Sequence, residues 1–145
     1  MVLLYQLGAM LEPALGRVRF VALYAAALLS GSFGVLLISP LALTAGASGA
    51  VFGLFGAAAV GLHQRGRNVL QTSVGLLLVI NLVLTFVIPG ISIGGHVGGL
   101  IGGGLVGAVM LRVAPTGSGR RAYAEGLAMA AVVIVAAVVG SLHVA

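Results

Sequence analysis

Long runs without a charged residue constrain this chain more than any other feature. Several runs reach about 20 residues, the length that an α-helix needs to cross a hydrocarbon layer of about 30 Å. Charged residues make up only 6% of the 145 residues, against about 25% in ordinary soluble domains. So few polar side chains cannot cover a soluble core of this size. The sequence therefore predicts an all-α, polytopic transmembrane helix bundle.

The apolar runs between polar breaks predict five full spans and a partial N-terminal helix. The partial helix covers residues 1–11, which are apolar but too few to span a bilayer. The five spans are predicted at residues 20–39, 45–62, 69–88, 91–111 and 122–144. We expect residues 1–145 to form one membrane domain.

All the basic residues other than histidine are arginines, and alternation of the spans places all of them on one face of the membrane. They precede the first full span, or lie in or beside the loops at 63–68 and 115–119: Arg17, Arg19, Arg65, Arg67, Arg112, Arg120 and Arg121. The loops on the other face carry no charge. Cytoplasmic loops are enriched in Lys and Arg, so we expect the arginine face to be cytoplasmic. Arginines arranged in this way do not indicate binding of nucleic acid.

Glycine contributes 24 residues and forms rows at intervals of four in two of the predicted spans. The rows consist of Gly49, Gly53 and Gly61 with Ala57, and of Gly95, Gly99, Gly103 and Gly107 beside Gly94, Gly98 and Gly102. Small residues at this spacing let helix backbones approach closely in lipid. The rows therefore predict contact between the spans at 45–62 and 91–111, although most such rows pack helices and carry no chemistry.

Ionisable groups within spans are the first candidates for function, because burying them in hydrocarbon costs free energy. His96 is the histidine near the start of a glycine-rich span, and both carboxylates, Glu12 and Glu125, lie at helix ends. A neutral imidazole can accept the proton of a serine hydroxyl and so create a nucleophile. Ser48 lies near the start of the other glycine-rich span, at similar depth and toward the same arginine-free face. A Ser48 and His96 dyad is one interpretation. In the alternative, Ser48 bonds back to its own helix and a loop carbonyl satisfies His96.

These residues resemble the rhomboid family of intramembrane serine proteases. The family's GxSG and HxxGxxxG motifs are matched by Gly46, Ser48, Gly49, His96, Gly99 and Gly103. Phe52 stands where the family has an aromatic residue that packs on the catalytic imidazole. The segments LGAMLEPALGRVRF at 7–20 and VIPGISIGGHVGGL at 87–100 are similar as well. The span at 122–144 resembles the last helix of the forms with seven spans.

The resemblance implies a serine endopeptidase in which Ser48 is the nucleophile and His96 the general base. The residues implied to support them are Gly46, Gly49, Phe52, Gly99 and Gly103. Single-span membrane proteins would be the substrates, cut near the outer face of the lipid bilayer. No cofactor, metal or nucleic acid is expected.

The similarity to the family begins part-way through its pattern. The family's first helix and most of its second, with a His and an Asn that help to hold the oxyanion, have no counterpart in this sequence. Losing one oxyanion donor typically lowers turnover by about 10²- to 10³-fold. Two alternatives therefore stay open: a rhomboid-like pseudoprotease that binds membrane helices without cutting them, and a small channel or transporter subunit packed through glycine.

Overall fold

The computed structural model describes residues 2–41, 47–112 and 119–144. Within these ranges the chain forms six α-helices and one short 3-10 helix, and no β-strand. The helices are α1 (Val2–Leu15), α2 (Arg17–Ile38), α3 (Ser48–Gln64), η1 (Val69–Gln71), α4 (Ser73–Val87), α5 (Ile93–Arg112) and α6 (Gly119–Val144). The predicted all-α class is confirmed.

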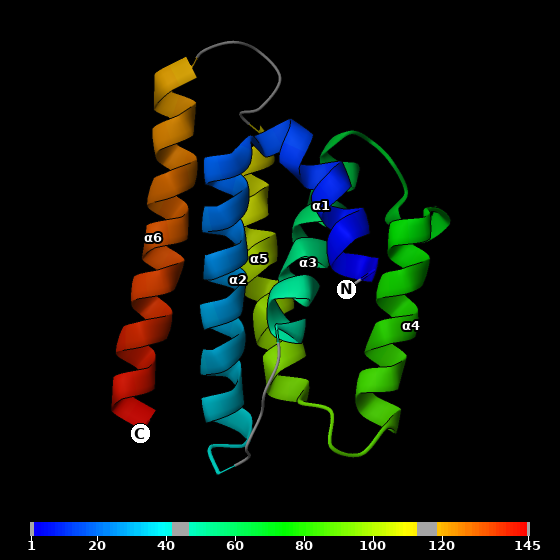
Figure 1. Ribbon diagram of the computed structural model, residues 1–145, viewed down its shortest axis with the longest axis vertical. Helices are drawn as coiled ribbons and strands as arrows, with labels where there is room; N and C mark the ends of the chain where they lie inside the picture. Colours follow the sequence, from blue (N-terminus) through cyan, green and yellow to red (C-terminus); the bar gives the residue numbers. More distant parts are fainter. Residues whose placement is uncertain (1, 42–46, 113–118, 145) are drawn as a thin grey trace.

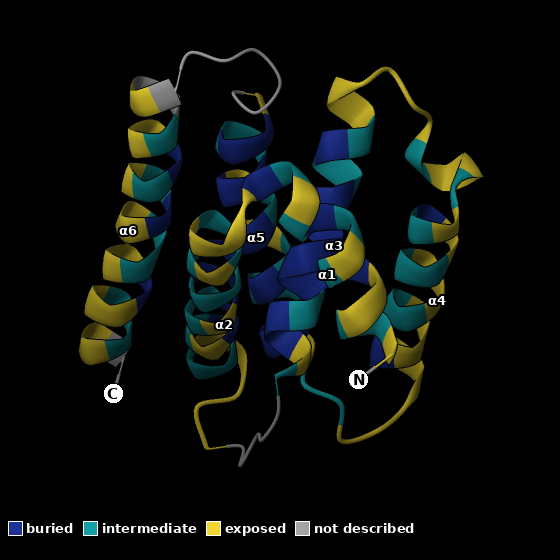
Figure 2. Ribbon diagram, turned by 45° about the horizontal axis from the view of Figure 1, so that its top comes forward, coloured by how far each residue is buried: buried dark blue, intermediate teal, exposed yellow. Residues whose placement is uncertain are grey.

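The long helices alternate in direction along the bundle. In Figure 1, α2, α4 and α6 descend while α3 and α5 ascend, so the first residues of α3 and α5 lie at the same end. The ends of the helices that carry arginines, such as the start of α2 and the end of α5, lie at the opposite end. Figure 2 shows the most buried residues concentrated on α3 and α5, with α4 and α6 on the outside.

Within the part of the chain that the structure describes, three helical segments are long and apolar enough to cross a membrane: α2, α5 and residues Tyr123–His143 of α6. Helices α1 and α4 are apolar but shorter. Large apolar side chains cover the outer face of α4, namely Leu76, Val79, Ile80, Val83, Leu84, Phe86 and Val87. An apolar surface of this kind, on helices of this length, belongs in lipid. The chain is an integral membrane protein. Its five predicted full spans are not confirmed, because only three of the described helices are both long and apolar enough to cross a membrane.

Helix α1 is longer than the sequence predicts. It continues through Pro13 to Leu15, whereas the prediction ends it at residue 11. Pro13 cannot donate a backbone hydrogen bond to the carbonyl four residues earlier, which favours an earlier end. Leu7, Leu11 and Leu15 are all buried, and their spacing of four places them on one face of a helix. Burial of Leu15 on the same face as Leu7 and Leu11 favours continuation of the helix past Pro13.

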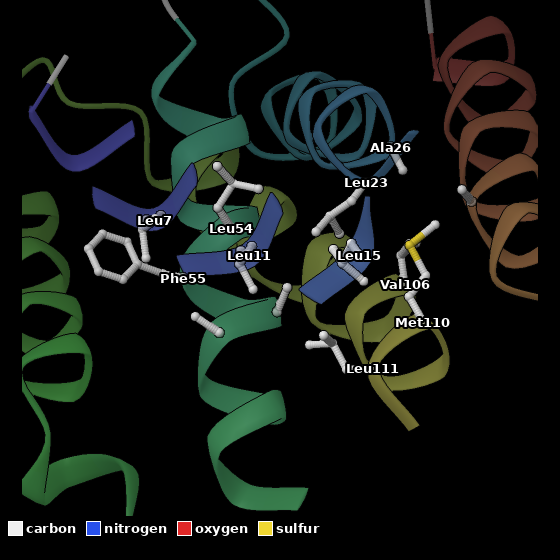
Figure 3. Close-up of a cluster of buried hydrophobic side chains, with 13 residues drawn as sticks. Leu7, Leu11, Leu15, Leu23, Ala26, Leu54, Phe55, Val106, Met110 and Leu111 are labelled. Carbon is white, nitrogen blue, oxygen red and sulfur yellow. The ribbon is translucent and has the colours of Figure 1, made fainter. Parts of the chain in front are cut away.

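A cluster of buried apolar side chains joins α1 to the other helices toward the arginine end of the bundle (Figure 3). Its labelled members are Leu7, Leu11, Leu15, Leu23, Ala26, Leu54, Phe55, Val106, Met110 and Leu111. They come from α1, α2, α3 and α5. These four helices supply most of the packed core, to which α6 adds the buried side chain of Ala130.

The span predicted at 69–88 begins later than expected. Residues Val69–Gln71 form η1, and Asn68 caps it by accepting a hydrogen bond from Leu70 N at 3.1 Å. Thr72 then caps α4, because its hydroxyl oxygen accepts a hydrogen bond from Gly75 N at 3.2 Å. Hydroxyl and amide side chains stabilise helix starts in this way. The two caps divide one apolar run into two helices.

The predicted contact between the two glycine-rich spans is confirmed. A Cβ placed on Gly99 would fall on the backbone of Gly49, and one placed on Gly103 would fall on the backbone of Gly53. The backbones of α3 and α5 are therefore in direct contact over at least two turns. This contact fixes α5 relative to α3 at the level of the candidate site.

The second glycine row of α5 contacts a different helix. A Cβ on Gly94 would meet the backbone of Gly34, and one on Gly98 would lie 2.6 Å from the carbonyl oxygen of Ser30. Both partners belong to α2. Helix α5 is therefore held between α2 and α3, with one glycine face toward each. The sequence did not predict α2 as the second partner.

Candidate active site

The helix that carries His96 begins with a side-chain cap. The hydroxyl oxygen of Ser92 accepts a hydrogen bond from Gly95 N at 3.1 Å, and the carbonyl of Ser92 accepts one from His96 N at 3.1 Å. Serine is a preferred cap because it satisfies amide groups that have no partner within the helix. His96 consequently lies in the first turn of α5, where 8% of its surface is exposed.

The imidazole of His96 lies against an aromatic ring of α3. The centroids of the His96 and Phe52 rings are 4.0 Å apart and their planes are inclined by 15°, which is a stacked arrangement. Phe52 in turn contacts Phe55 edge-on, with centroids 6.2 Å apart. Stacking fixes the plane of the imidazole, because rotation out of that plane would break the contact. This is the contact that the resemblance implied for Phe52.

A hydroxyl of α4 forms a hydrogen bond with Nδ1, at the edge of the imidazole ring. The distance between Thr85 Oγ1 and His96 Nδ1 is 2.7 Å, and Thr85 is 2% exposed. The same hydroxyl lies 2.7 Å from the carbonyl oxygen of Asn81, one turn earlier in α4. His96 is thus held by α3 through stacking and by α4 through a hydrogen bond. The partner of Nδ1 is this hydroxyl and not the loop carbonyl considered above.

Ser48 is the first residue of α3 and its side chain is exposed. The next residue approaches α5 closely, because a Cβ on Gly49 would lie 2.9 Å from the carbonyl oxygen of Gly95. The neighbour of Ser48 and the neighbour of His96 are therefore in backbone contact. No hydrogen bond joins the described side chains of Ser48 and His96. In a protein without substrate such bonds are often long and tighten only in the reacting complex.

The remaining predicted residues divide into two groups. Gly99 packs on Gly49, the residue after Ser48, and Gly103 packs on Gly53 one turn further along. Gly46 lies outside the described residues.

No group of three or more His, Asp or Glu side chains that could hold a metal ion occurs in the ranges described.

Comparison with known protein families supplies an independent test of the resemblance. A family model described as the Rhomboid domain matches residues 1–113 of the chain. The chain belongs to the rhomboid family. The matched rhomboid region includes α1 to α5 and both sequence motifs, and it ends before α6. Comparisons with curated proteins and with solved structures found no match.

Rhomboid proteins are in general intramembrane serine proteases. Two features of this rhomboid site are not predicted by the sequence. One is Thr85, and the other is the contact of α5 with α2. A signal for Thr85 was present, since Asn81 and Thr85 are polar residues one turn apart in an otherwise apolar helix. Polar residues within a membrane helix usually face other helices or a cavity. The partners that the sequence predicts for His96 are Ser48 or a loop carbonyl, and Thr85 is not among them.

Proposed function

We propose that this rhomboid protein is an intramembrane serine endopeptidase with Ser48 as nucleophile and His96 as general base. The observation that carries the proposal is the restraint on His96, whose ring is stacked on Phe52 and bonded through Nδ1 to Thr85. An imidazole held in this way keeps Nε2 as its reactive nitrogen. Ser48, which is exposed, begins the neighbouring helix α3 at the same end of the bundle.

The proposed reaction is acyl transfer, in which a serine hydroxyl is the nucleophile and an imidazole is the base. Ser48 Oγ attacks the carbonyl carbon of a peptide bond, and its proton passes to His96 Nε2. His96 then gives this proton to the leaving amine as the C–N bond breaks, and an acyl-enzyme remains on Ser48. A water molecule, losing its proton to His96, hydrolyses the acyl-enzyme. The amide of Ser48, in the first turn of α3, supports the oxyanion because it has no partner within the helix.

The supporting residues act through helix packing. Gly49 and Gly99 allow the close approach of α3 and α5 that brings Ser48 and His96 to one level, and Gly103 extends the approach by one turn. Gly46 completes the GxSG motif. No cofactor or metal is needed for acyl transfer by this mechanism.

Substrates in this proposal are single-span membrane proteins. Their helices must unwind locally to expose a peptide bond, and small residues near the outer face make this easier. The arginine loops are cytoplasmic and the site opens toward the opposite face. Residues 1–145 act as one domain with five spans. Helices α3 and α4, with 17 and 15 residues, are about 25 and 22 Å long and cross a locally thinner bilayer.

A fluorophosphonate probe tests the proposal on the membrane-extracted protein. The probe reacts with an activated serine, with loss of fluoride and formation of an Oγ–P bond. We expect labelling of the wild type and none of Ser48→Ala or His96→Ala. Ser32→Ala is the matched control, because Ser32 is also exposed but bonds to the carbonyl of Leu28 within α2. Equal labelling of wild type and Ser48→Ala would contradict the proposal.

A pseudoprotease that binds membrane helices without cutting them is the second candidate. The observation that favours it is the absence of a hydrogen bond between the described side chains of Ser48 and His96. A folded wild type that retains single-span helices in detergent but takes up no probe would support this candidate. Binding without labelling thus separates the two functions.

A further inference from the structure

Thr85 makes two hydrogen bonds with a single hydroxyl group. Its Oγ1 is 2.7 Å from the carbonyl oxygen of Asn81 and 2.7 Å from Nδ1 of His96. Each of these short contacts needs one proton between its heavy atoms. The way in which the two protons are supplied decides the state of the imidazole.

Only one distribution of protons satisfies both contacts. A carbonyl oxygen has no proton to give, so the bond to Asn81 must use the proton of the Thr85 hydroxyl. The hydroxyl has no second proton, so the bond with His96 must use a proton on Nδ1, and Thr85 Oγ1 accepts it. A neutral imidazole that carries its proton on Nδ1 has its lone pair on Nε2.

From this geometry we propose that Thr85 is a positioning residue that selects the tautomer of His96 in which Nε2 is the free base. The inference rests on the proposed function, in which Nε2 receives the proton of Ser48. Thr85 would take the place that a carboxylate has in a Ser-His-Asp triad, as a neutral acceptor from Nδ1–H. A neutral acceptor orients the imidazole without adding a charge to the membrane interior.

Burial makes the selection effective. Thr85 and His96 are 2% and 8% exposed, so water has little access to replace the hydroxyl as the partner of Nδ1. Removing the hydroxyl leaves a buried donor without an acceptor, which is costly. The other tautomer, with its proton on Nε2, avoids this cost because it has no donor on Nδ1. That tautomer cannot accept the Ser48 proton at Nε2.

Three variants separate positioning from a general effect on folding. Thr85→Val keeps the branched shape but removes the hydroxyl, and Thr85→Ser keeps the hydroxyl. Ser141→Ala is the matched control, since Ser141 donates to the carbonyl of Ala137 one turn earlier at 2.6 Å, in α6. Both Thr85→Val and Ser141→Ala lose a hydroxyl bonded to its own helix, but only Thr85→Val affects His96.

The first measurement is the ¹⁵N NMR spectrum of protein labelled at its histidines, with the His96 signals assigned by their loss in His96→Ala. We expect an unprotonated Nε2 and a protonated Nδ1 in the wild type, in Thr85→Ser and in Ser141→Ala. We expect the proton on Nε2 in Thr85→Val. A wild type with its proton on Nε2 would overturn the inference, and this result is read from the wild type, so it does not depend on whether a Thr85 variant folds.

The second measurement is the rate of fluorophosphonate labelling. We expect Thr85→Val to react about 10- to 100-fold more slowly than the wild type, as is expected when a buried donor loses its acceptor. Thr85→Ser and Ser141→Ala should react at close to the wild-type rate. A Thr85→Val variant with the wild-type rate and tautomer would refute the positioning role. A wild type that does not react would count against the proposed function alone, because the spectra still decide the tautomer.

Discussion

The contact between α3 and α5 can be tested with one added methyl group at each of two adjacent glycines. A Cβ on Gly103 would overlap the backbone of Gly53, whereas a Cβ on Gly104 would lie 3.9 Å from its nearest neighbours on Gly56. Gly103→Ala therefore forces two backbones apart, and Gly104→Ala meets only an ordinary contact. Both changes replace glycine by alanine within one helix, so the gain in helix propensity is common to them.

The difference between these two variants isolates the steric cost. Overpacking of a well-packed interior costs about 1–3 kcal/mol, so Gly103→Ala should be less stable than Gly104→Ala by this amount. The unfolding equilibrium then differs by about 5- to 140-fold. The cost should lie at the upper end of the range, because backbone atoms cannot rotate away as a flexible side chain can.

Unfolding of the purified variants in mixed micelles with increasing dodecyl sulfate, followed by circular dichroism, measures this difference. Gly104→Ala should unfold at or above the wild-type midpoint and Gly103→Ala clearly below it. Equal midpoints for the two variants would refute the reasoning that glycine is required at Gly103 by direct backbone contact.

Three further predictions concern other parts of the molecule. Arg19 donates from Nη1 to the carbonyl of Met110 at 3.5 Å, and its guanidinium lies 4.8 Å from the ring centroid of an α6 tyrosine. Arg19→Ala should therefore lower the free energy of unfolding by about 1 kcal/mol. Arg17→Ala is the control and should leave this free energy unchanged, because the Arg17 side chain is 92% exposed. Equal unfolding midpoints for the two variants would contradict the prediction. Phe52→Ala should slow fluorophosphonate labelling about tenfold, because it releases the imidazole from its stacked partner. Phe52→Tyr keeps the stacked ring and should react at the wild-type rate. A wild-type rate for Phe52→Ala would show that stacking is dispensable. The orientation in the membrane can be tested with single cysteines, because the chain has none. Leu41→Cys places a thiol at the end opposite the arginine loops, and Arg67→Cys places one within an arginine loop. Since the arginine loops are expected to be cytoplasmic, an impermeant maleimide applied to intact cells should label only Leu41→Cys.

The positions of most helices follow from the sequence because they depend on local patterns. Apart from the end of α1 and the start of α4, the described helix bounds agree with the predicted spans to within three residues. The exception in α1 shows where local patterns fail. Pro13 is a signal for a helix end, yet Leu15 is buried against other helices, and burial depends on neighbours that a local pattern does not contain.

The candidate site could be predicted only where its residues carry recognisable motifs. Gly49 and Gly99 belong to such motifs, and the glycine rows that contain them predict that their two helices are in contact. Thr85 belongs to none, because a hydroxyl in an apolar helix ordinarily bonds to its own backbone, as Thr85 does with Asn81. Its second bond, with His96, exists only because α4 presents this face to α5. The glycine row of α5 that packs on α2 is similar, since a row of small residues indicates a close neighbour without saying which helix it is.

In the proposed function, Ser48 and His96 together cleave a peptide bond within the membrane. The most direct test is to reconstitute the protein in liposomes with a single-span substrate that carries small residues near the outer face, and to determine the product masses. We expect the wild type to give two fragments, separated at one peptide bond in that region, and Ser48→Ala or His96→Ala to leave the substrate intact. Cleavage that persists unchanged in Ser48→Ala would contradict it.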